Sequence, residues 1–173
     1  AIIVRENKTF LDLIVEQMIE LNNKFQSDVP LMLMNSFRTH SITERIVGLS
    51  RGATKVISFC QSWYPRLLDD DSGFLNPLKF NLDAWYPPGH GDLYSCLLDK
   101  GYIDDLLKEG REYLFISNSD NLGATVDLKV LNFIINNEIP FLMEVASKTE
   151  VDTKGGVLCQ NKKQIKLLEI ADV

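Results

Sequence analysis

The sequence has 173 residues, of which 45% are hydrophobic and 24% are charged, and its mean hydropathy is close to zero. This composition predicts a soluble globular protein, either one domain with a sizeable core or a piece of a larger one. The net charge of −6 argues against a nucleic-acid binder, which normally displays a basic patch. No apolar run approaches the roughly 20 residues that a membrane span needs.

The cysteines and the first residues indicate the setting of the protein. Cys60, Cys96 and Cys159 are widely spaced and odd in number, so a reducing, cytoplasmic compartment fits better than a disulfide framework. A zinc site that adds His40 and His90 to Cys60 and Cys96 has little support, because no two of them have the short spacing of zinc ligands. The chain begins with neither a signal peptide nor a transit peptide, and we expect it to start in the middle of a longer sequence.

The first part of the chain alternates between helix-like and strand-like spacing of apolar residues. Thr9 is the expected N-cap of a helix, because an acidic residue follows three places on, and an apolar stripe continues to Phe25. The continuous apolar run at residues 31–34 predicts a strand buried on both faces, and residues 55–59 predict a second strand. A weaker helix is expected between them, over residues 41–49.

Residues 60–91 are predicted to form a long loop without a helix. Loops of this length in compact domains are usually functional or disordered, and the tryptophans and tyrosines of this segment argue against disorder. Residues 92–100 then predict a helix, with Asp92 as its N-cap and Gly101 at its carboxyl end.

The second part of the chain continues the alternation. Residues 113–116 give the strongest strand prediction of the sequence, and Thr125 is expected to cap the next helix. Residues 140–145 predict another strand, and residues 157–158 and 165–170 predict a hairpin around residues 161–163. Strands that alternate with helices indicate an α/β fold with a mostly parallel mixed sheet flanked by helices.

In an open parallel sheet, ligands bind beyond the carboxyl ends of the strands, and three polar stretches are expected there. The first contains Gln61, which follows the strand at residues 55–59. Its amide offers a donor and an acceptor, which suits an amide-bearing base such as uracil. A polar residue in a turn explains Gln61 as well, and spacing alone favours this second interpretation.

The second stretch runs from Pro87 to Asp92 and contains Gly89, His90 and Gly91. The glycines permit close approach of a ligand to the backbone, and free amides with a positive dipole end are expected where the helix begins at Asp92. Helix starts of this kind bind phosphate, to which His90 could donate a hydrogen bond. A tight turn with an exposed histidine accounts for the same residues equally well.

The third stretch, residues 117–121, follows the strongest predicted strand. Asp120 is a natural Mg²⁺ ligand for the phosphates of a nucleotide, and Asn118 could bind sugar hydroxyls. An Asx-turn would explain the same residues, although the run of polar side chains favours function. No Ser-His-Asp or Cys-His arrangement is evident in the sequence, which disfavours covalent catalysis.

Together these stretches resemble the eukaryotic-type UTP–glucose-1-phosphate uridylyltransferases, also called UDP-glucose pyrophosphorylases. Among them are Trp85-Tyr86-Pro87-Pro88-Gly89-His90-Gly91-Asp92 and Ser117-Asn118-Ser119-Asp120-Asn121, and the matching segments are residues 9–13, 29–37, 61–66, 84–92, 117–127 and 154–156. The resemblance implies a GT-A-like (Rossmann-like) nucleotidyltransferase domain, with residues 1–173 as its central part. The family's glycine-rich nucleotide loop and its C-terminal β-helix would lie outside this sequence.

The resemblance also implies an activity, which is the transfer of a uridylyl group from UTP to glucose 1-phosphate. UDP-glucose and pyrophosphate would form by direct in-line displacement with Mg²⁺. By resemblance, the contacts would be Gln61 to uracil, the Gly89 backbone to UTP, His90, Asn118 and Ser119 to the sugar phosphate, and Asp120 to Mg²⁺ and the nucleotide. No catalytic group is assigned within residues 1–173.

Two alternatives stay open at this point. The first is a non-catalytic nucleotide-sugar binding or assembly module with the same fold, and the second is a uridylyltransferase with broader sugar 1-phosphate specificity. An intact glycine-rich loop and lysine upstream would favour the enzyme. Homo-oligomerisation through the family's C-terminal region, which would lie outside this sequence, is a further expectation.

Overall fold

The computed structural model describes residues 2–49, 54–69, 73–149, 155–162 and 164–168. In chain order its elements are β1 (Ile3–Arg5), β2 (Lys8–Thr9), α1 (Phe10–Phe25), β3 (Leu31–Asn35), α2 (His40–Leu49), β4 (Val56–Cys60), β5 (Tyr64–Pro65), α3 (Pro77–Phe80), the 3₁₀ helix η1 (Asn81–Ala84), β6 (Trp85–Tyr86), α4 (Asp92–Asp99), α5 (Tyr102–Lys108), α6 (Leu128–Asn136), β7 (Val157–Asn161) and β8 (Gln164–Leu168). They fall into two compact units, Ala1–Val126 and Asp127–Val173. No helix in the described part of the chain is long and apolar enough to cross a bilayer.

Helix α1 begins where the sequence predicted. The Thr9 hydroxyl accepts a hydrogen bond from the Asp12 amide, and the Asp12 carboxylate accepts one from the Thr9 amide. This reciprocal capping box satisfies two amides that would otherwise lack a partner at the helix start. The helix turns its apolar side inward and buries Val15, of which only 2% is exposed.

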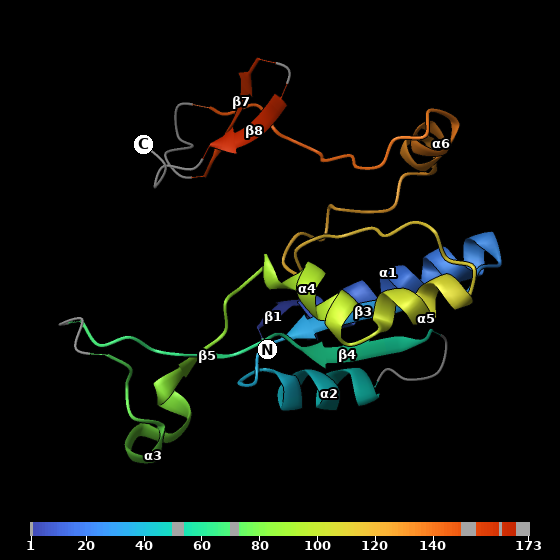
Figure 1. Cartoon of the computed structure of the whole chain (residues 1–173). Helices are drawn as coiled ribbons and strands as arrows, with labels where there is room; N and C mark the ends of the chain where they lie inside the picture. The colour runs from blue at the N-terminus through green and yellow to red at the C-terminus, as the bar shows by residue number, and fades with distance from the viewer. Residues whose placement is uncertain (1, 50–53, 70–72, 150–154, 163, 169–173) are drawn as a thin grey trace. The chain divides into compact units, whose positions relative to one another are not determined.

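The centre of the first unit is a parallel pair of strands. Strands β3 and β4, both predicted from the sequence, pair in register from Leu31 with Val56 to Asn35 with Cys60. In Figure 1, α2 lies on one side of this pair and α4 and α5 lie on the other. Phe59 of β4 packs into the buried core together with Cys96 and Leu97 of α4.

A buried polar network holds the carboxyl end of the parallel pair. Asn35 is 7% exposed, and its side chain donates to Ser58 Oγ at 2.9 Å and accepts from Thr43 Oγ1 at 2.7 Å. Every buried polar group that lacks a partner costs free energy, and here each has one. The network therefore fixes the ends of β3 and β4 relative to α2.

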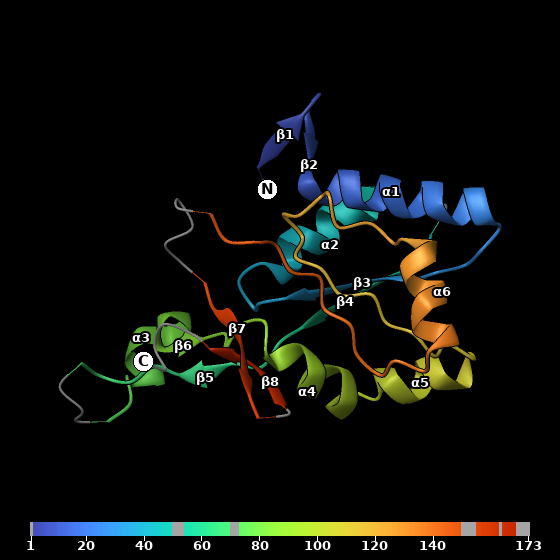
Figure 2. The same cartoon turned by 90° about the horizontal axis from the view of Figure 1, so that it is seen from above.

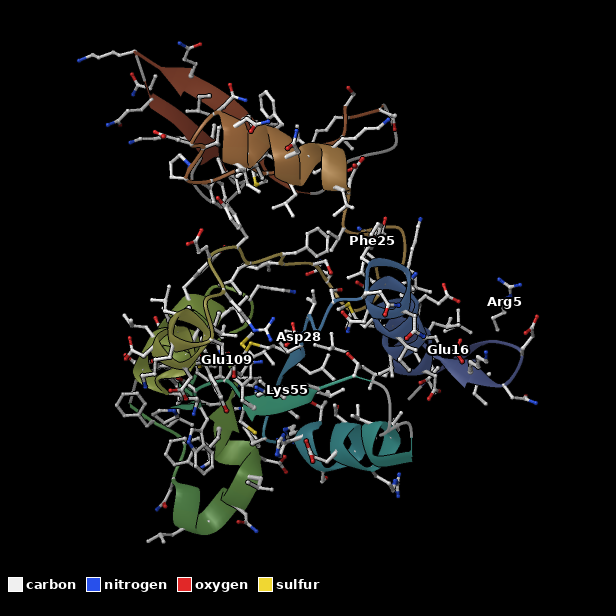
Figure 3. The ribbon with its side chains drawn as sticks, turned by 90° about the vertical axis from the view of Figure 1, so that its right-hand side faces the viewer. Arg5, Glu16, Phe25, Asp28, Lys55 and Glu109 are labelled. Carbon is white, nitrogen blue, oxygen red and sulfur yellow. The ribbon has the colours of Figure 1, made fainter. Side chains whose placement is uncertain are left out.

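The opposite, amino end of the pair is held by charges. Glu109 accepts hydrogen bonds from Lys55 Nζ at 2.7 Å and from Arg111 Nε at 2.9 Å, and Arg111 Nη2 also binds Asp28 Oδ2 at 3.0 Å. Figure 3 shows the labelled Asp28, Lys55 and Glu109 side chains close together. We call these four residues the charge clamp, because they join the chain before β3 and β4 to the end of α5.

Residues 60–91 contain more structure than the sequence predicted, and the expectation of no helix is wrong. Helix α3 starts at Pro77, and the Asn76 Oδ1 accepts from the Leu78 amide at 2.9 Å. An Asn cap followed by proline in the first turn is a helix-start signal that the sequence interpretation did not use. The short strands β5 and β6 pair antiparallel, Tyr64 with Tyr86 and Pro65 with Trp85.

The predicted helix at residues 92–100 is present as α4, with one correction. Its N-cap is Gly91, which makes no side-chain cap hydrogen bond, so Asp92 is the first helical residue and not the cap. Gly101 follows with φ of +74°, a left-handed conformation that glycine adopts without strain. It allows the chain to turn directly into α5, a helix that the sequence interpretation missed.

The strands predicted at residues 113–116 and 140–145 are not present. Both segments are without strand pairing and exposed, with Phe115 at 54% and Phe141 at 68%. Apolar, β-branched sequence favours a strand only where another strand offers a pairing edge, and none in the described part of the chain does so here. The one parallel pair among the described strands is β3–β4, and three antiparallel pairs accompany it. The structure is therefore a mixed α/β arrangement of short sheets and helices.

The second unit consists of α6 and a hairpin. The cap of α6 is Asp127, whose Oδ1 accepts from the Lys129 amide at 2.7 Å, so the predicted Thr125 cap is wrong by two positions. The predicted hairpin is confirmed, since β7 and β8 pair antiparallel from Val157 with Leu168 to Asn161 with Gln164. Residues 163, 169 and 170 of that prediction lie outside the described residues.

Candidate functional site

A surface pocket lies at the carboxyl end of the parallel pair. The Gln61 amide donates to the Asn35 carbonyl at 2.8 Å, which extends the β3–β4 pairing by one step. Beyond this point a pocket of about 460 Å³ is lined by Phe37, Cys60, Gln61, Ser62, Trp63, Tyr64 and Lys100. The structure thus places Gln61 in a concave site at the edge of the sheet where open parallel sheets bind ligands.

Two hydrogen bonds tie the Gln61 loop to the loop before α4. The Gly89 amide donates to Gln61 Oε1 at 2.7 Å, and the Ser62 amide donates to Asp92 Oδ2 at 2.7 Å. Each loop therefore supplies one backbone donor and one side-chain acceptor. Because one lone pair of the Gln61 oxygen already accepts from Gly89, the two N–H groups of its Nε2 are the donors that this amide can present to a ligand.

Gly89 is bound through its backbone on both sides. Its amide donates to Gln61, and its carbonyl accepts from the Asp92 amide at 3.2 Å. Its φ of +103° is a conformation that L side chains rarely adopt. The glycine is thus needed for the shape of the loop itself, and the second lone pair of its carbonyl oxygen is what the backbone still offers to a ligand.

His90 lies beside the start of α4 and is exposed, but the amides there are not free. The Asp92 and Leu93 amides donate back to the Gly89 and His90 carbonyls at 3.2 and 3.1 Å. The Asp92 carboxylate also places negative charge at the positive end of the helix dipole. The expectation that free amides bind phosphate here is therefore wrong for these first two amides. The group that this loop can still offer to a phosphate is the His90 ring.

The carboxylate of Asp92 is the charged centre of the loop junction. It accepts from the Cys96 thiol, with Sγ to Oδ2 at 3.0 Å, and from the Ser62 amide. These donors lower the pKa of Asp92. Burial, together with the neighbouring carboxylate, raises the pKa of the Cys96 thiol, and burial raises that of Cys60 as well. At neutral pH the structure holds a carboxylate and neutral thiols.

Aromatic rings form one wall of the site. The Trp63 ring stands between Phe37, with centroids 5.6 Å apart, and Trp85, with centroids 5.2 Å apart. Trp63 is 53% exposed, so part of this cluster of tilted rings faces solvent at the pocket. Such a surface offers a flat apolar face beside the polar Gln61 amide, the combination that suits a heterocycle or a sugar ring.

Asn118, Ser119 and Asp120 lie in a turn further along the chain. The Asn121 amide donates to the Asn118 carbonyl at 3.1 Å, and all three side chains are exposed without a hydrogen-bond partner among the described residues. In Figures 1 and 2 the chain after α5 runs back along β3 toward the end where β3 and β4 terminate. Gln17 of α1 donates to the Leu122 carbonyl at 3.1 Å and so holds this turn against α1.

Few side chains in the described part of the chain are grouped as metal ligands would be. The described residues contain no cluster of three or more His, Cys, Asp or Glu side chains that could hold a metal ion. His40 instead lies 3.3 Å from Ser58 Oγ, and Cys96 binds Asp92, which leaves the zinc interpretation without support. A single free carboxylate such as Asp120 still fits Mg²⁺, which proteins commonly hold with one or two carboxylates and the substrate's phosphates.

The structure brings Gln61, Gly89 and the loop of His90 together by direct contact. The chain after α5 also leads the Asn118–Asp120 turn toward the same end of the sheet. The roles of all these residues in ligand binding stay predictions. Sequence reasoning missed the pocket residues Phe37 and Lys100, whose positions depend on tertiary packing. Lys154 of the matching segment at 154–156 lies outside the described residues.

Comparison with known proteins gives a consistent family. The model of the UTP–glucose-1-phosphate uridylyltransferase family matches residues 1–173. The UTP–glucose-1-phosphate uridylyltransferases of Musa acuminata and Saccharomyces cerevisiae are each 50% identical over 173 residues, which is 98% of this chain and 37% and 34% of theirs. The chain therefore spans a little over one third of the length of these relatives.

Solved structures agree with the family match. A Trypanosoma brucei UDP-glucose phosphorylase superposes with a TM-score of 0.81 at 33% identity over 99% of this chain and 39% of that one. A Leishmania major UDP-glucose pyrophosphorylase variant in complex with UDP-glucose gives a TM-score of 0.78 at 33% identity over 95% of this chain and 38% of that one. The described arrangement thus occurs within larger proteins of known structure.

Proposed function

Because the chain belongs to the UTP–glucose-1-phosphate uridylyltransferase family, we propose that the full-length protein transfers the uridylyl group of UTP to glucose 1-phosphate. The products are UDP-glucose and pyrophosphate. Residues 1–173 supply the base-facing loop, the sugar-phosphate side and a metal carboxylate of the site. The observation that carries this proposal is the hydrogen bond between Gln61 and Gly89, since it joins two separately predicted ligand loops at one pocket.

Gln61 contacts the base in this proposal. Its Oε1 is held by Gly89, so that its Nε2 donates to a carbonyl oxygen of uracil. The neighbouring Trp63 ring, 53% exposed, offers a flat face next to the amide, which supports an aromatic or sugar ring as the occupant of the pocket.

His90, Asn118 and Ser119 contact the sugar phosphate. The exposed His90 ring donates a hydrogen bond to a phosphate oxygen, and the two exposed polar side chains of the turn bind oxygens of the sugar phosphate. Asp120 is the residue that would hold Mg²⁺ with the phosphates of the nucleotide. The bound ion would neutralise charge on those phosphates and so favour attack on them.

The reaction is a single displacement. A phosphate oxygen of glucose 1-phosphate attacks the α-phosphorus of UTP, the bond from that phosphorus to the bridging oxygen breaks, and pyrophosphate leaves with the electron pair. No side chain forms a covalent intermediate, so the contribution of these residues is orientation and charge stabilisation.

Three finer features belong to the same proposal. The parallel pair β3–β4 is part of a larger, mostly parallel GT-A-like sheet, which the TM-score of 0.81 over 99% of the chain supports. The free thiols of Cys60, Cys96 and Cys159 support a reducing, cytoplasmic setting. Homo-oligomerisation through the C-terminal region stays a proposal of the resemblance alone.

The test is an assay of the purified full-length protein with UTP, glucose 1-phosphate and Mg²⁺. We expect equal amounts of UDP-glucose and pyrophosphate, and the reverse reaction when both products are supplied. Galactose 1-phosphate in place of glucose 1-phosphate measures the breadth of sugar specificity. Calorimetric binding of UDP-glucose without any turnover would overturn the enzyme proposal and favour a non-catalytic nucleotide-sugar binding module.

A further inference from the structure

We propose that Asp92 is a positioning residue, which acts through Ser62 and Gly89 to hold the Gln61 amide in one orientation toward the nucleotide. This inference rests on the proposed function, because it concerns the side chain that meets the base. Asp92 itself touches neither the base nor the sugar phosphate in this proposal.

The carboxylate reaches out of its own helix to the neighbouring loop. Its Oδ2 accepts from the Ser62 amide at 2.7 Å, while the cap of α4 is Gly91 and makes no side-chain cap hydrogen bond. Ser62 directly follows Gln61, so the bond fixes the peptide plane that joins them. Hydrogen bonds to an ionised acceptor are about twice as strong as those between neutral groups.

The backbone of Gln61 is held from the opposite side by the sheet. Its amide donates to the Asn35 carbonyl at 2.8 Å, and Asn35 is itself fixed by the buried network with Thr43 and Ser58. Gln61 is thus anchored by β3 before it and by Asp92 after it. A residue held at both ends has few side-chain rotamers that reach the pocket.

The orientation of the amide decides what Gln61 offers to a ligand. With Oε1 bound to the Gly89 amide at 2.7 Å, the Nε2 donors face outward. A rotation of the amide by half a turn would present an acceptor instead. The Asp92 amide donates to the Gly89 carbonyl at 3.2 Å, so the residue whose carboxylate holds Ser62 is also tied through its backbone to Gly89.

The charge of Asp92 is stable at neutral pH. The Cys96 thiol, 3.0 Å from Oδ2, and the Ser62 amide both lower the pKa of the carboxyl. An ionised carboxylate accepts from both donors at once. Cys96 is 3% exposed, so its side of this contact is shielded from water.

The test is a double-mutant cycle in the full-length protein. We expect Asp92→Ala to raise the KM and the Kd for UTP about ten- to a hundredfold, with a much smaller change in kcat. Gln61→Ala should have a similar effect. The double variant should bind UTP with an affinity no lower than that of the single variant that binds it less tightly, because Asp92 acts only through Gln61.

Two further variants separate positioning from folding. Asp92→Asn keeps an oxygen that can accept from the Ser62 amide, so it should restore most of the UTP affinity. Asp99→Ala, at the exposed other end of α4, is the matched control and should bind UTP like the parent. If Asp92→Ala melts below the assay temperature, Asp92→Ser replaces it, because serine favours a helix start but is shorter than the carboxylate.

Amide hydrogen exchange provides a readout that does not depend on turnover. Asp92→Ala should accelerate exchange at both Ser62 and Gly89, and Asp99→Ala at neither. Losses in UTP affinity that add in the double variant, or an unchanged affinity in Asp92→Ala, would overturn the inference. A parent protein that neither binds nor converts UTP would instead overturn the proposed function, while the coupled exchange at Ser62 and Gly89 would still be expected.

Discussion

The side-chain oxygen of Gln61 lies 2.7 Å from the backbone nitrogen of Gly89 and accepts its hydrogen bond. The two residues are 28 positions apart in the sequence, and each was a candidate ligand contact for a separate reason. Their contact gives Gln61 two roles, since its oxygen ties the loops together and its nitrogen remains for a ligand. These roles can be separated by substitution.

We expect Gln61→Glu and Gln61→Ala to differ in stability but not in nucleotide binding. The glutamate carboxylate still accepts from the Gly89 amide but has lost both donors, so the loops should stay joined while UTP affinity falls about tenfold or more. The alanine variant loses the tie as well and should also melt at a lower temperature. Titration calorimetry with UTP and thermal melting measure the two effects, and a glutamate variant that binds UTP like the parent would remove the donor role.

We expect Asp120→Asn to lower kcat in the full-length protein by about a hundredfold. The amide keeps the shape of the side chain but removes the charge that a metal ligand needs. Asp104→Asn, an exposed position in the first turn of α5, is the matched control. Steady-state assays over a range of Mg²⁺ concentrations provide the measurement, and a turnover equal to that of the parent at every concentration would exclude Asp120 as the metal carboxylate.

We expect His90→Ala to raise the KM for glucose 1-phosphate more than the KM for UTP. The first amides of α4 are already paired, so the ring is the main donor that this loop offers to a phosphate oxygen. His90→Gln retains an N–H donor and should recover part of the loss. Initial rates with each substrate varied in turn distinguish the two constants, and equal changes in both would contradict the assignment.

The elements that sequence predicted well have local causes. Neighbouring residues specify the Thr9 cap, since Asp12 follows three residues on, and the strand patterns that correspond to β3 and β4. Residues 113–116 show the limit of such signals. Their apolar side chains favour a strand, but a strand forms only where the edge of another strand is available for pairing, and no local pattern specifies that edge.

The candidate site was predicted in its parts and not in its connections. Gln61, Gly89 and His90 were found because strand ends and glycine-rich turns are visible in a sequence. The contact of Ser62 with Asp92 spans 30 positions, and the position of Lys100 in the pocket depends on how α4 packs. The sequence also predicted Asp92 as a helix cap, whereas its carboxylate accepts a hydrogen bond from the neighbouring loop. Only tertiary contacts determine which of these two roles the carboxylate takes.

We expect the charge clamp to make the fold sensitive to acid through Glu109. Hydrogen bonds from Lys55 and then Arg111 hold the pKa of Glu109 below its ordinary value. The ionised carboxylate therefore contributes stability above the ordinary pKa of about 4.3, and this contribution is lost as the pH falls through the lowered pKa of the folded state.

The Glu109→Gln variant tests this contribution by urea denaturation at several pH values. It should be less stable than the parent at neutral pH, and the difference should shrink below about pH 4. High salt should reduce the difference as well, because Glu109 is 38% exposed at its side chain and exposed pairs are screened. A difference that stayed constant from neutral pH down to about pH 3 would show that the charge of Glu109 is not the cause.

We expect the Cys96 thiol to react slowly with iodoacetamide at neutral pH, and Asp92→Asn to make it react faster. Burial and the Asp92 carboxylate both raise the pKa of this thiol, so little reactive thiolate is present. Removing the negative charge lowers the pKa while Cys96 stays buried, whereas Asp99→Asn leaves the contact between Sγ and Oδ2 intact. Mass spectrometry of the labelled peptides over a pH series gives the apparent pKa of Cys96. If the Asp92→Asn and Asp99→Asn profiles coincide, burial alone controls Cys96, and its hydrogen bond to Asp92 does not affect its ionisation.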